Sequence, residues 1–204
     1  MTILKPGFAI EGEIDGERML RSIERAGRTC YKSEAKITET SAREFAHKII
    51  ASGHESVIEH EHVSVRIICD RGVSHEIVRH RLASYSQEST RYCNYSKGEV
   101  TFIDPCFWAP LSGPHEVWRA AMQAAEGAYL LLLAMGASPQ QARSVLPNSL
   151  KTELVMTANL REWRHFFKLR TGDGAHPQMR EIAKPLLREF QLRIPVIFED
   201  IDNG

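Results

Sequence analysis

The chain has 204 residues, which falls within the range of one domain and is long enough to bury a sizeable core. Apolar residues make up 43% of it and charged residues 25%, the balance of a globular protein in water. Its 26 basic and 26 acidic residues cancel, which argues against a protein whose main task is to grip nucleic acid or an anionic membrane.

Four cysteines are spread along the chain without a CxxC pair, as is typical of reduced thiols in a cytosolic protein. They are Cys30, Cys69, Cys93 and Cys106. Residues 1–6 lack the apolar core of a signal peptide, and the longest apolar run, 128–135, is too short to span a bilayer. We therefore expect a cytoplasmic protein.

The first part of the chain alternates between strand and helix signals. In chain order, the residues predict a strand over 8–14, a helix over 17–26, a loop over 33–40, a helix that begins at 41 and ends at 53, a strand over 62–69, a turn at 70–72 and a helix over 73–80. Ser41 and Glu44 form a capping-box signal for the second helix, and Gly53 follows its last turn.

The second part is richer in helices. In chain order, the residues predict an extended functional loop over 84–92, a strand over 101–103, a helix over 117–135 opened by Gly113-Pro114, a helix over 140–146, a strand (or, alternatively, a helix) over 150–158, and helices over 160–169 and 178–192. Ser138 and Asn159 are expected N-caps. We expect Val117 on the apolar side of the longest helix and Leu169 on the core side of its own helix.

The stretch Arg79–Tyr92 combines arginines with hydroxyl side chains and contains no Gly, Pro or Lys. Closely placed guanidinium groups repel each other unless an anion lies between them, and they bind phosphate or carboxylate bidentately. This density predicts a site for a phosphorylated or otherwise anionic ligand. The alternative is a solvated helix face with ion pairs to Glu76 and Glu88, since cations are also favoured near a helix C-terminus.

A second polar stretch, 54–62, contains several histidines and glutamates and raises the question of a metal. A zincin motif needs histidines four apart on a helix, whereas His75 and His80 are five apart and point in different directions. We therefore predict no metal, and we interpret His54, His60 and His62 as surface or capping residues.

Four blocks in this order resemble the flavin-dependent thymidylate synthases, and together with the run 177–182 the matches span residues 53–182. They are Gly53-His54-Glu55-Ser56 through Glu59-His60; Arg79-His80-Arg81 followed after seven residues by Ser89-Thr90-Arg91-Tyr92; Arg143 with Leu146-Pro147; and Asn159-Leu160-Arg161-Glu162-Trp163-Arg164-His165-Phe166 ending in Leu169-Arg170. One such motif is weak evidence, but four in the right order are specific.

The resemblance implies methylation of dUMP to dTMP. Methylenetetrahydrofolate would supply the carbon, and NADPH would supply the reducing equivalents through bound FAD. It also implies an α/β fold of the α+β type, with a mixed, largely antiparallel sheet flanked by helices. The expected assembly is a homotetramer with sites shared between subunits, built from a single domain over residues 1–204. The family is not thought to use a cysteine nucleophile.

The resemblance assigns site residues by position. Those implied to line FAD are Ser56, Arg79, His80, Arg81, Gln87, Asn159, Arg161 and His165, with His54 in the same segment as Ser56. Those implied to line dUMP are Glu76, Arg79, Gln87, Glu88, Ser89, Thr90, Arg91, Arg143 and Arg170. Arg170 is the expected catalytic residue, because a guanidinium against the uracil edge would stabilise negative charge on the ring. Its alternative role is to close the helix that begins after Asn159.

Two positions differ from the family pattern. Ser86-Gln87 stands where the family often has Asn-Glu, with Glu88 one place later, and the run 177–182 is one residue longer than the family's Ala-Gln-x-Glu-Ile.

Three other functions remain open from sequence. A relative could hydroxymethylate dUMP or methylate UMP, and a metal-dependent hydrolase could use the histidines of 54–80. A single-stranded nucleic-acid binder could use three arginines with three tyrosines as stacking platforms, namely Arg79, Arg81, Arg91, Tyr85, Tyr92 and Tyr95.

Overall fold

Four strands from different parts of the sequence form one sheet, in the order β2 (Gly7–Glu11), β3 (His62–Asp70), β6 (Lys151–Asn159) and β4 (Ala83–Gln87). Buried and partly exposed residues alternate along β3 and β6. This period of two is what a sheet with one better-buried face requires. The strands predicted over 8–14, 62–69 and 150–158 are therefore confirmed, although the first ends at Glu11.

The pairing of β3 with β6 is antiparallel. The amide of Leu160 donates to the carbonyl of Glu61, the hydroxyls of Ser64 and Thr157 lie 2.7 Å apart, and the amide of Arg71 donates to the carbonyl of Leu150. The residue numbers of the partners thus decrease along β6 as they increase along β3, as in an antiparallel pair. A second sheet pairs β1 (Thr2–Leu4) with β5 (Thr101–Ile103) in parallel. The expected mixed, largely antiparallel sheet with flanking helices is confirmed.

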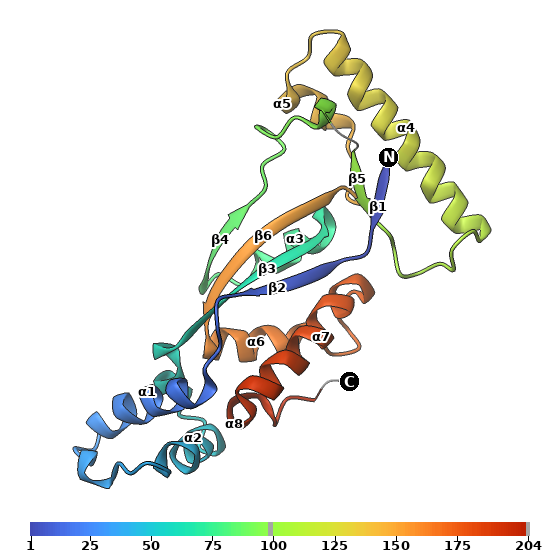
Figure 1. Ribbon diagram of the computed structural model, residues 1–204. Coiled ribbons are helices and arrows are strands. Elements are labelled where there is room, and N and C mark those ends of the chain that lie inside the picture. Colours follow the sequence, from blue (N-terminus) through green and yellow to red (C-terminus); the bar gives the residue numbers. More distant parts are fainter. Residues whose placement is uncertain (98–99, 203–204) are drawn as a thin grey trace. The chain divides into compact units, whose positions relative to one another are not determined.

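The computed structural model describes residues 1–97 and 100–202, which divide into two compact units (Figure 1). The first unit contains Met1–Gly7, Ile67–Arg79 and Tyr85–Val155, and the second contains Phe8–Arg66, His80–Ser84 and Met156–Gly204. In this described part of the chain, no helix is both long and apolar enough to cross a bilayer.

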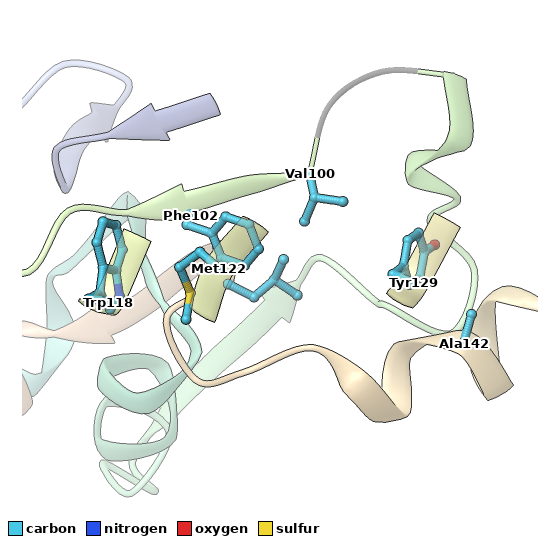
Figure 2. Packing of buried hydrophobic residues seen from close by; sticks show 7 residues of the cluster. Val100, Phe102, Trp118, Met122, Tyr129 and Ala142 are labelled. Atoms are coloured by element: carbon cyan, nitrogen blue, oxygen red, sulfur yellow. The ribbon is translucent and has the colours of Figure 1, made fainter. Parts of the chain in front are cut away.

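The first unit contains most of the middle of the chain. Its helices are α3 (Arg71–Ile77), η3 (Tyr95–Lys97), α4 (Gly113–Ala134), α5 (Pro139–Ala142) and η4 (Arg143–Val145). Figure 2 shows its core, in which Phe102 of β5 packs with Met122 of α4. Trp118 and Tyr129 of α4 belong to the same buried cluster, so one stripe of this long helix covers β5.

The second unit is mainly helical. Its helices are α1 (Gly16–Thr29), η1 (Glu34–Lys36), α2 (Ser41–Ala51), η2 (Glu55–His60), α6 (Leu160–Arg170), α7 (Pro177–Arg193) and α8 (Pro195–Phe198) (Figure 1). Trp163 and Phe167 of α6 pack against Phe190 of α7, with ring centroids 5.1 to 5.7 Å apart. Such aromatic clusters bury large areas and prefer these offset geometries.

Several local predictions were wrong. Residues 70–72 are not a turn, because Asp70 accepts a hydrogen bond from the amide of Val73 and caps α3. Ser41 does not cap α2, since it is the first helical residue and its hydroxyl donates to Glu24 of α1 at 2.8 Å. The loop predicted over 84–92 begins as strand β4, and the helix predicted over 140–146 is divided into α5 and η4.

Two apolar side chains expected inside are exposed. The side chain of Val117 is 72% exposed and that of Leu169 is 51% exposed. Val117 lies one residue before the buried Trp118, and Leu169 lies two residues after the buried Phe167. Each residue along a helix rotates the side chain by about 100°, so both side chains point away from the buried stripe. By contrast, Ser138 and Asn159 cap their helices as predicted, and Gly53 has the positive φ expected after a helix end.

Candidate active site

Helix α6 presents one polar face in the second unit. Glu162, His165 and Arg170 recur at spacings of three and five residues, and with Phe166 they surround the buried side chain of His80. The rings of His80 and His165 have centroids 5.3 Å apart, and those of His80 and Phe166 are 5.0 Å apart. The structure therefore gathers three predicted site residues, His80, His165 and Arg170.

Both ring nitrogens of His80 are hydrogen-bonded. Nδ1 lies 3.0 Å from Oε1 of Glu162, and Nε2 accepts a hydrogen bond of 3.2 Å from Nε of Arg170. Burial lowers the pKa of His80 below its ordinary value, the hydrogen bond to Glu162 acts in the opposite direction, and the charge of Arg170 lowers it again. At neutral pH the imidazole is accordingly uncharged.

The same side chains are the candidate metal ligands. Among the described residues, ligand atoms of His80, Glu162 and His165 lie within 4.8 Å of one another, whereas His54, His60 and His62 belong to no such group. Because Arg170 donates to Nε2 of His80 and Glu162 lies at Nδ1, both nitrogens are already engaged by protein groups. A cation beside this guanidinium would also be repelled. The arrangement thus favours a hydrogen-bonded chain over a metal site.

A cavity of about 560 Å³ opens at the start of α6. Its lining residues are Glu55, Glu59, Leu82, Asn159, Arg161, Glu162, Arg164, His165 and Lys168. Asn159 accepts a hydrogen bond of 2.8 Å from the amide of Glu162 and caps the helix, and Arg161 donates to Glu59 at 2.6 Å. Three predicted flavin residues, Asn159, Arg161 and His165, therefore line one cavity.

The remaining predicted flavin residues are distributed more widely. Ser56 is exposed on η2 and Arg81 is exposed in the segment before β4, each next in sequence to a residue that lines the cavity. Arg79 and Gln87 belong to the first unit. Gln87 donates from Nε2 to the hydroxyls of Ser74 and Thr152, at 3.0 and 3.1 Å.

Sequence reasoning missed the buried guanidinium of Arg164. It is 2% exposed and donates to Glu55 at 3.0 Å, to both carboxylate oxygens of Asp200 at 2.6 and 2.7 Å, and to the carbonyl of Ile197. It thus ties η2 and the C-terminal segment to α6. The only signal for it in the sequence is its place within the fourth block, between Trp163 and His165.

In the first unit, the predicted nucleotide residues gather near α5 and η4. Arg143 donates to the buried hydroxyl of Thr90 at 3.0 Å, and Arg91 donates to Gln140 at 3.2 Å. The hydroxyl of Ser89 accepts from the amide of Arg91 at 3.3 Å. Two guanidinium groups and two hydroxyls from distant parts of the sequence are therefore brought together, as an anion-binding site requires.

Glu88 lies in a separate hydrogen-bonded group of the first unit. Its carboxylate accepts from Tyr95 at 2.7 Å and from Lys151 at 2.9 Å, two partners that sequence reasoning missed. Burial raises the pKa of Tyr95, and the hydrogen bond to Glu88 raises it further, so the phenol stays protonated. Glu76, also predicted to contact the nucleotide, is a half-buried residue of α3.

Comparisons with known proteins agree with the four blocks. The family model for thymidylate synthase complementing protein (Thy1) matches residues 15–196. A flavin-dependent thymidylate synthase of Geobacter sulfurreducens is 36% identical over 186 residues, covering 88% of this chain and 80% of that protein. One from Mycobacterium sp. (strain JLS) is 38% identical over 215 residues, covering 93% and 83%.

A solved structure shares the fold. The crystal structure of a UMP/dUMP methylase, PolB, from Streptomyces cacaoi bound with 5-Br dUMP has a TM-score of 0.82 and 22% identity to this chain, and the match covers 98% of this chain and 96% of that one. The resemblance seen in the motif blocks is thus confirmed by relatives along most of the chain. The chain belongs to the flavin-dependent thymidylate synthase family.

Proposed function

We propose that this flavin-dependent methyltransferase binds FAD and converts dUMP to dTMP, with methylenetetrahydrofolate as carbon donor and NADPH as reductant. The observation that carries the proposal is the cavity at the start of α6, which is lined by three of the residues that the motif blocks assign to the flavin. Family membership supports the reaction type, because the relatives named above are flavin-dependent thymidylate synthases.

The side chains of the cavity fit the anionic part of a dinucleotide. Arg161, His165 and Lys168 supply donors. Arg161 and Lys168 also carry positive charge, which the lining carboxylates of Glu59 and Glu55 balance in the absence of a ligand. The N-terminus of α6, an 11-residue helix, adds amide dipoles that favour a phosphate. Leu82 supplies an apolar contact. Asn159, Arg161 and His165 would hold FAD here, with Ser56, His80 and Arg81 from the neighbouring segments as further proposed contacts. Arg79 and Gln87, which belong to the first unit, remain predicted flavin residues. When bound, the flavin transfers the reducing equivalents of NADPH.

Arg170 is the proposed catalytic residue. Its guanidinium stays protonated at all relevant pH values and offers donors in a planar fork. Placed against the uracil edge, it would stabilise the negative charge that develops when N3 loses its proton, and this is electrostatic stabilisation that needs no proton transfer from the protein. Its Nε is held by His80, which fixes the position of the fork.

The nucleotide phosphate is proposed to bind Arg91 and Arg143. Both guanidinium groups belong to exposed residues near α5, and the hydroxyls of Ser89 and Thr90 lie beside them. Charge-assisted bonds from arginine to phosphate are short and often bidentate. Glu76, Gln87 and Glu88 are the remaining proposed contacts to dUMP.

We also propose that the whole chain acts as one domain, because the family model matches residues that belong to both units. A homotetramer with shared sites is supported by the apolar side chains that α4 exposes, which include Val117 and Leu131. A cytoplasmic location is supported by four free cysteines. Sedimentation velocity and cell fractionation test the assembly and the location.

The function is tested by spectroscopy followed by product analysis. We expect the purified protein to show a flavin spectrum that bleaches with NADPH under anaerobic conditions, and to convert dUMP with methylenetetrahydrofolate to dTMP. A colourless protein that takes up no FAD would refute the proposal. Hydroxymethylated dUMP as the product, or methylation of UMP in preference to dUMP, would favour the two related enzymes considered from sequence. Zinc, iron or manganese in the protein together with hydrolytic activity would favour the metal enzyme.

A further inference from the structure

Arg170 determines which nitrogen of His80 carries the proton. A guanidinium has N–H donors and no acceptor, and it is not deprotonated in proteins. Nε of Arg170 lies 3.2 Å from Nε2 of His80, so Nε2 must present its lone pair. The single proton of the neutral imidazole is then on Nδ1.

Glu162 matches this tautomer. Nδ1 lies 3.0 Å from Oε1 of Glu162, and a carboxylate accepts the N–H bond that the Nδ1 tautomer offers. The side chains of His80 and Glu162 are 2% and 7% exposed, so water does not compete strongly for either bond. The rings of Phe166 and His80 pack in an edge-type arrangement, which restricts rotation of the imidazole. The carboxylate, the imidazole and the guanidinium therefore form one directional chain.

We propose that Glu162 and His80 are positioning residues for Arg170, with Glu162 holding the imidazole ring of His80 in place through Nδ1 and His80 fixing the direction of the guanidinium. The inference rests on the catalytic role proposed above for Arg170. The bond to His80 uses Nε, the guanidinium nitrogen that is attached to the aliphatic part of the side chain. The Glu162–His80–Arg170 hydrogen-bonded chain therefore sets the angle of the Nη1–Nη2 fork relative to a planar ligand edge. Small errors in such angles are costly to catalysis.

The first experiment replaces Glu162 with Gln. The amide is uncharged, so its oxygen accepts the Nδ1 proton through a weaker bond than the carboxylate does and holds the imidazole less firmly. We expect kcat for dTMP formation to fall roughly 10- to 100-fold, as when partners that orient a catalytic group are removed. Because Glu162 lines the cavity proposed for FAD, kcat is compared with the wild type at equal flavin content.

The matched control is Glu24→Gln. Glu24 is equally buried in the same unit and accepts hydrogen bonds from Arg28 and Ser41, away from His80. The Glu24→Gln variant should lose about as much stability as Glu162→Gln and keep the wild-type kcat. If Glu162→Gln keeps wild-type kcat, or if both variants lose kcat to the same extent, the positioning role is refuted.

The second experiment compares two amides at position 80. Gln can place its carbonyl near the position of Nε2 and accept from Arg170, whereas Asn reaches only the position of Nδ1 and thus only Glu162. We expect His80→Gln to retain more kcat than His80→Asn at equal flavin content. Equal loss in the two variants, or greater loss in His80→Gln, would overturn the inference.

The tautomer itself can be observed by nitrogen NMR of ¹⁵N-histidine-labelled protein. The signals of His80 are assigned as those that are missing from the spectrum of His80→Gln. We expect a protonated Nδ1 and an unprotonated Nε2 in the wild type, and the opposite pattern or a charged imidazole would refute the chain. This measurement does not depend on turnover. If no flavin binds and no dTMP forms, the proposed function fails by itself, whereas wild-type turnover in Glu162→Gln refutes only the positioning role.

Discussion

Asp200 holds the buried guanidinium of Arg164 through both carboxylate oxygens, at 2.6 and 2.7 Å. Arg164 comes from α6 and Asp200 from the segment after α8, and the same guanidinium reaches Glu55 of η2. A buried charge needs such partners, because an unpaired one would cost several kcal/mol. The pair therefore fastens the C-terminal segment to the helix that lines the cavity.

Replacing Asp200 with Ala should destabilise the protein. The change leaves two N–H groups of Arg164 without their acceptors, which lowers the free energy of unfolding by roughly 1–3 kcal/mol. Urea unfolding followed by tryptophan fluorescence measures the effect. Asp173→Ala is the matched control, because Asp173 is 98% exposed and its bond to Arg180 is at the surface. Equal stability of the two variants would contradict the role of Asp200 as the acceptor for the buried guanidinium of Arg164.

The same pair predicts a pH dependence. The hydrogen bonds from Arg164 hold the pKa of Asp200 below its ordinary value, and the charge of Lys168 adds to this effect. A carboxylate with a lowered folded-state pKa stabilises the fold above its unfolded pKa of about 3.9 and loses this contribution as the pH falls through the lower value. The stability difference between wild type and Asp200→Asn should thus be largest at neutral pH and shrink below about pH 4. A difference that stays constant on acidification would be inconsistent with this linkage.

Arg143→Ala should weaken nucleotide binding without affecting the flavin. Loss of one charge-assisted bond to a phosphate is expected to raise the Kd for dUMP roughly 10- to 100-fold. Calorimetric titration of the flavin-loaded protein with dUMP gives this constant. Arg119→Ala, which removes a partly exposed arginine of α4 in the same unit, serves as control. Wild-type dUMP affinity in Arg143→Ala would exclude Arg143 as a phosphate ligand.

Cys69 should be dispensable for the reaction. Its side chain is completely buried, and burial raises the pKa of the thiol, so almost no thiolate exists at neutral pH. Cys69→Ala is expected to keep kcat and to lose roughly 1–2 kcal/mol of stability through the small cavity it creates. Turnover and urea unfolding of the variant test both statements. A folded, flavin-loaded variant without turnover would show that the thiol takes part in the chemistry.

Much of the fold was predictable because its signals are local. Alternation predicted β3 and β6, and the capping side chains of Ser138 and Asn159 marked two helix starts correctly. The failures also have local causes. Aspartate is common both in turns and at helix N-caps, so Asp70 by itself did not distinguish the two. The hydroxyl of Ser41 donates to Glu24 of α1 and does not cap its own helix.

The candidate site was predictable only in part. The motif blocks pointed to His80, His165 and Arg170, which the structure brings together around α6. Glu162 and Arg164 belong to the same block but were not singled out, because nothing in a linear sequence shows which of its polar residues face inward. Glu162 is buried beside His80, and Arg164 is buried beside Ile197 of α8 and Asp200, residues that are distant in the sequence.

The sequence by itself determined the family, the residue types of the site and most of the helices and strands, since motifs, caps and hydrophobic periodicity are properties of neighbouring residues. Only the tertiary structure decided which of these residues meet. Glu162 pairs with a histidine 82 positions away, Asp200 with Arg164, and Arg143 with Thr90. Such contacts join residues that chain entropy keeps apart until the core has packed, so their identity is set by packing of the whole unit.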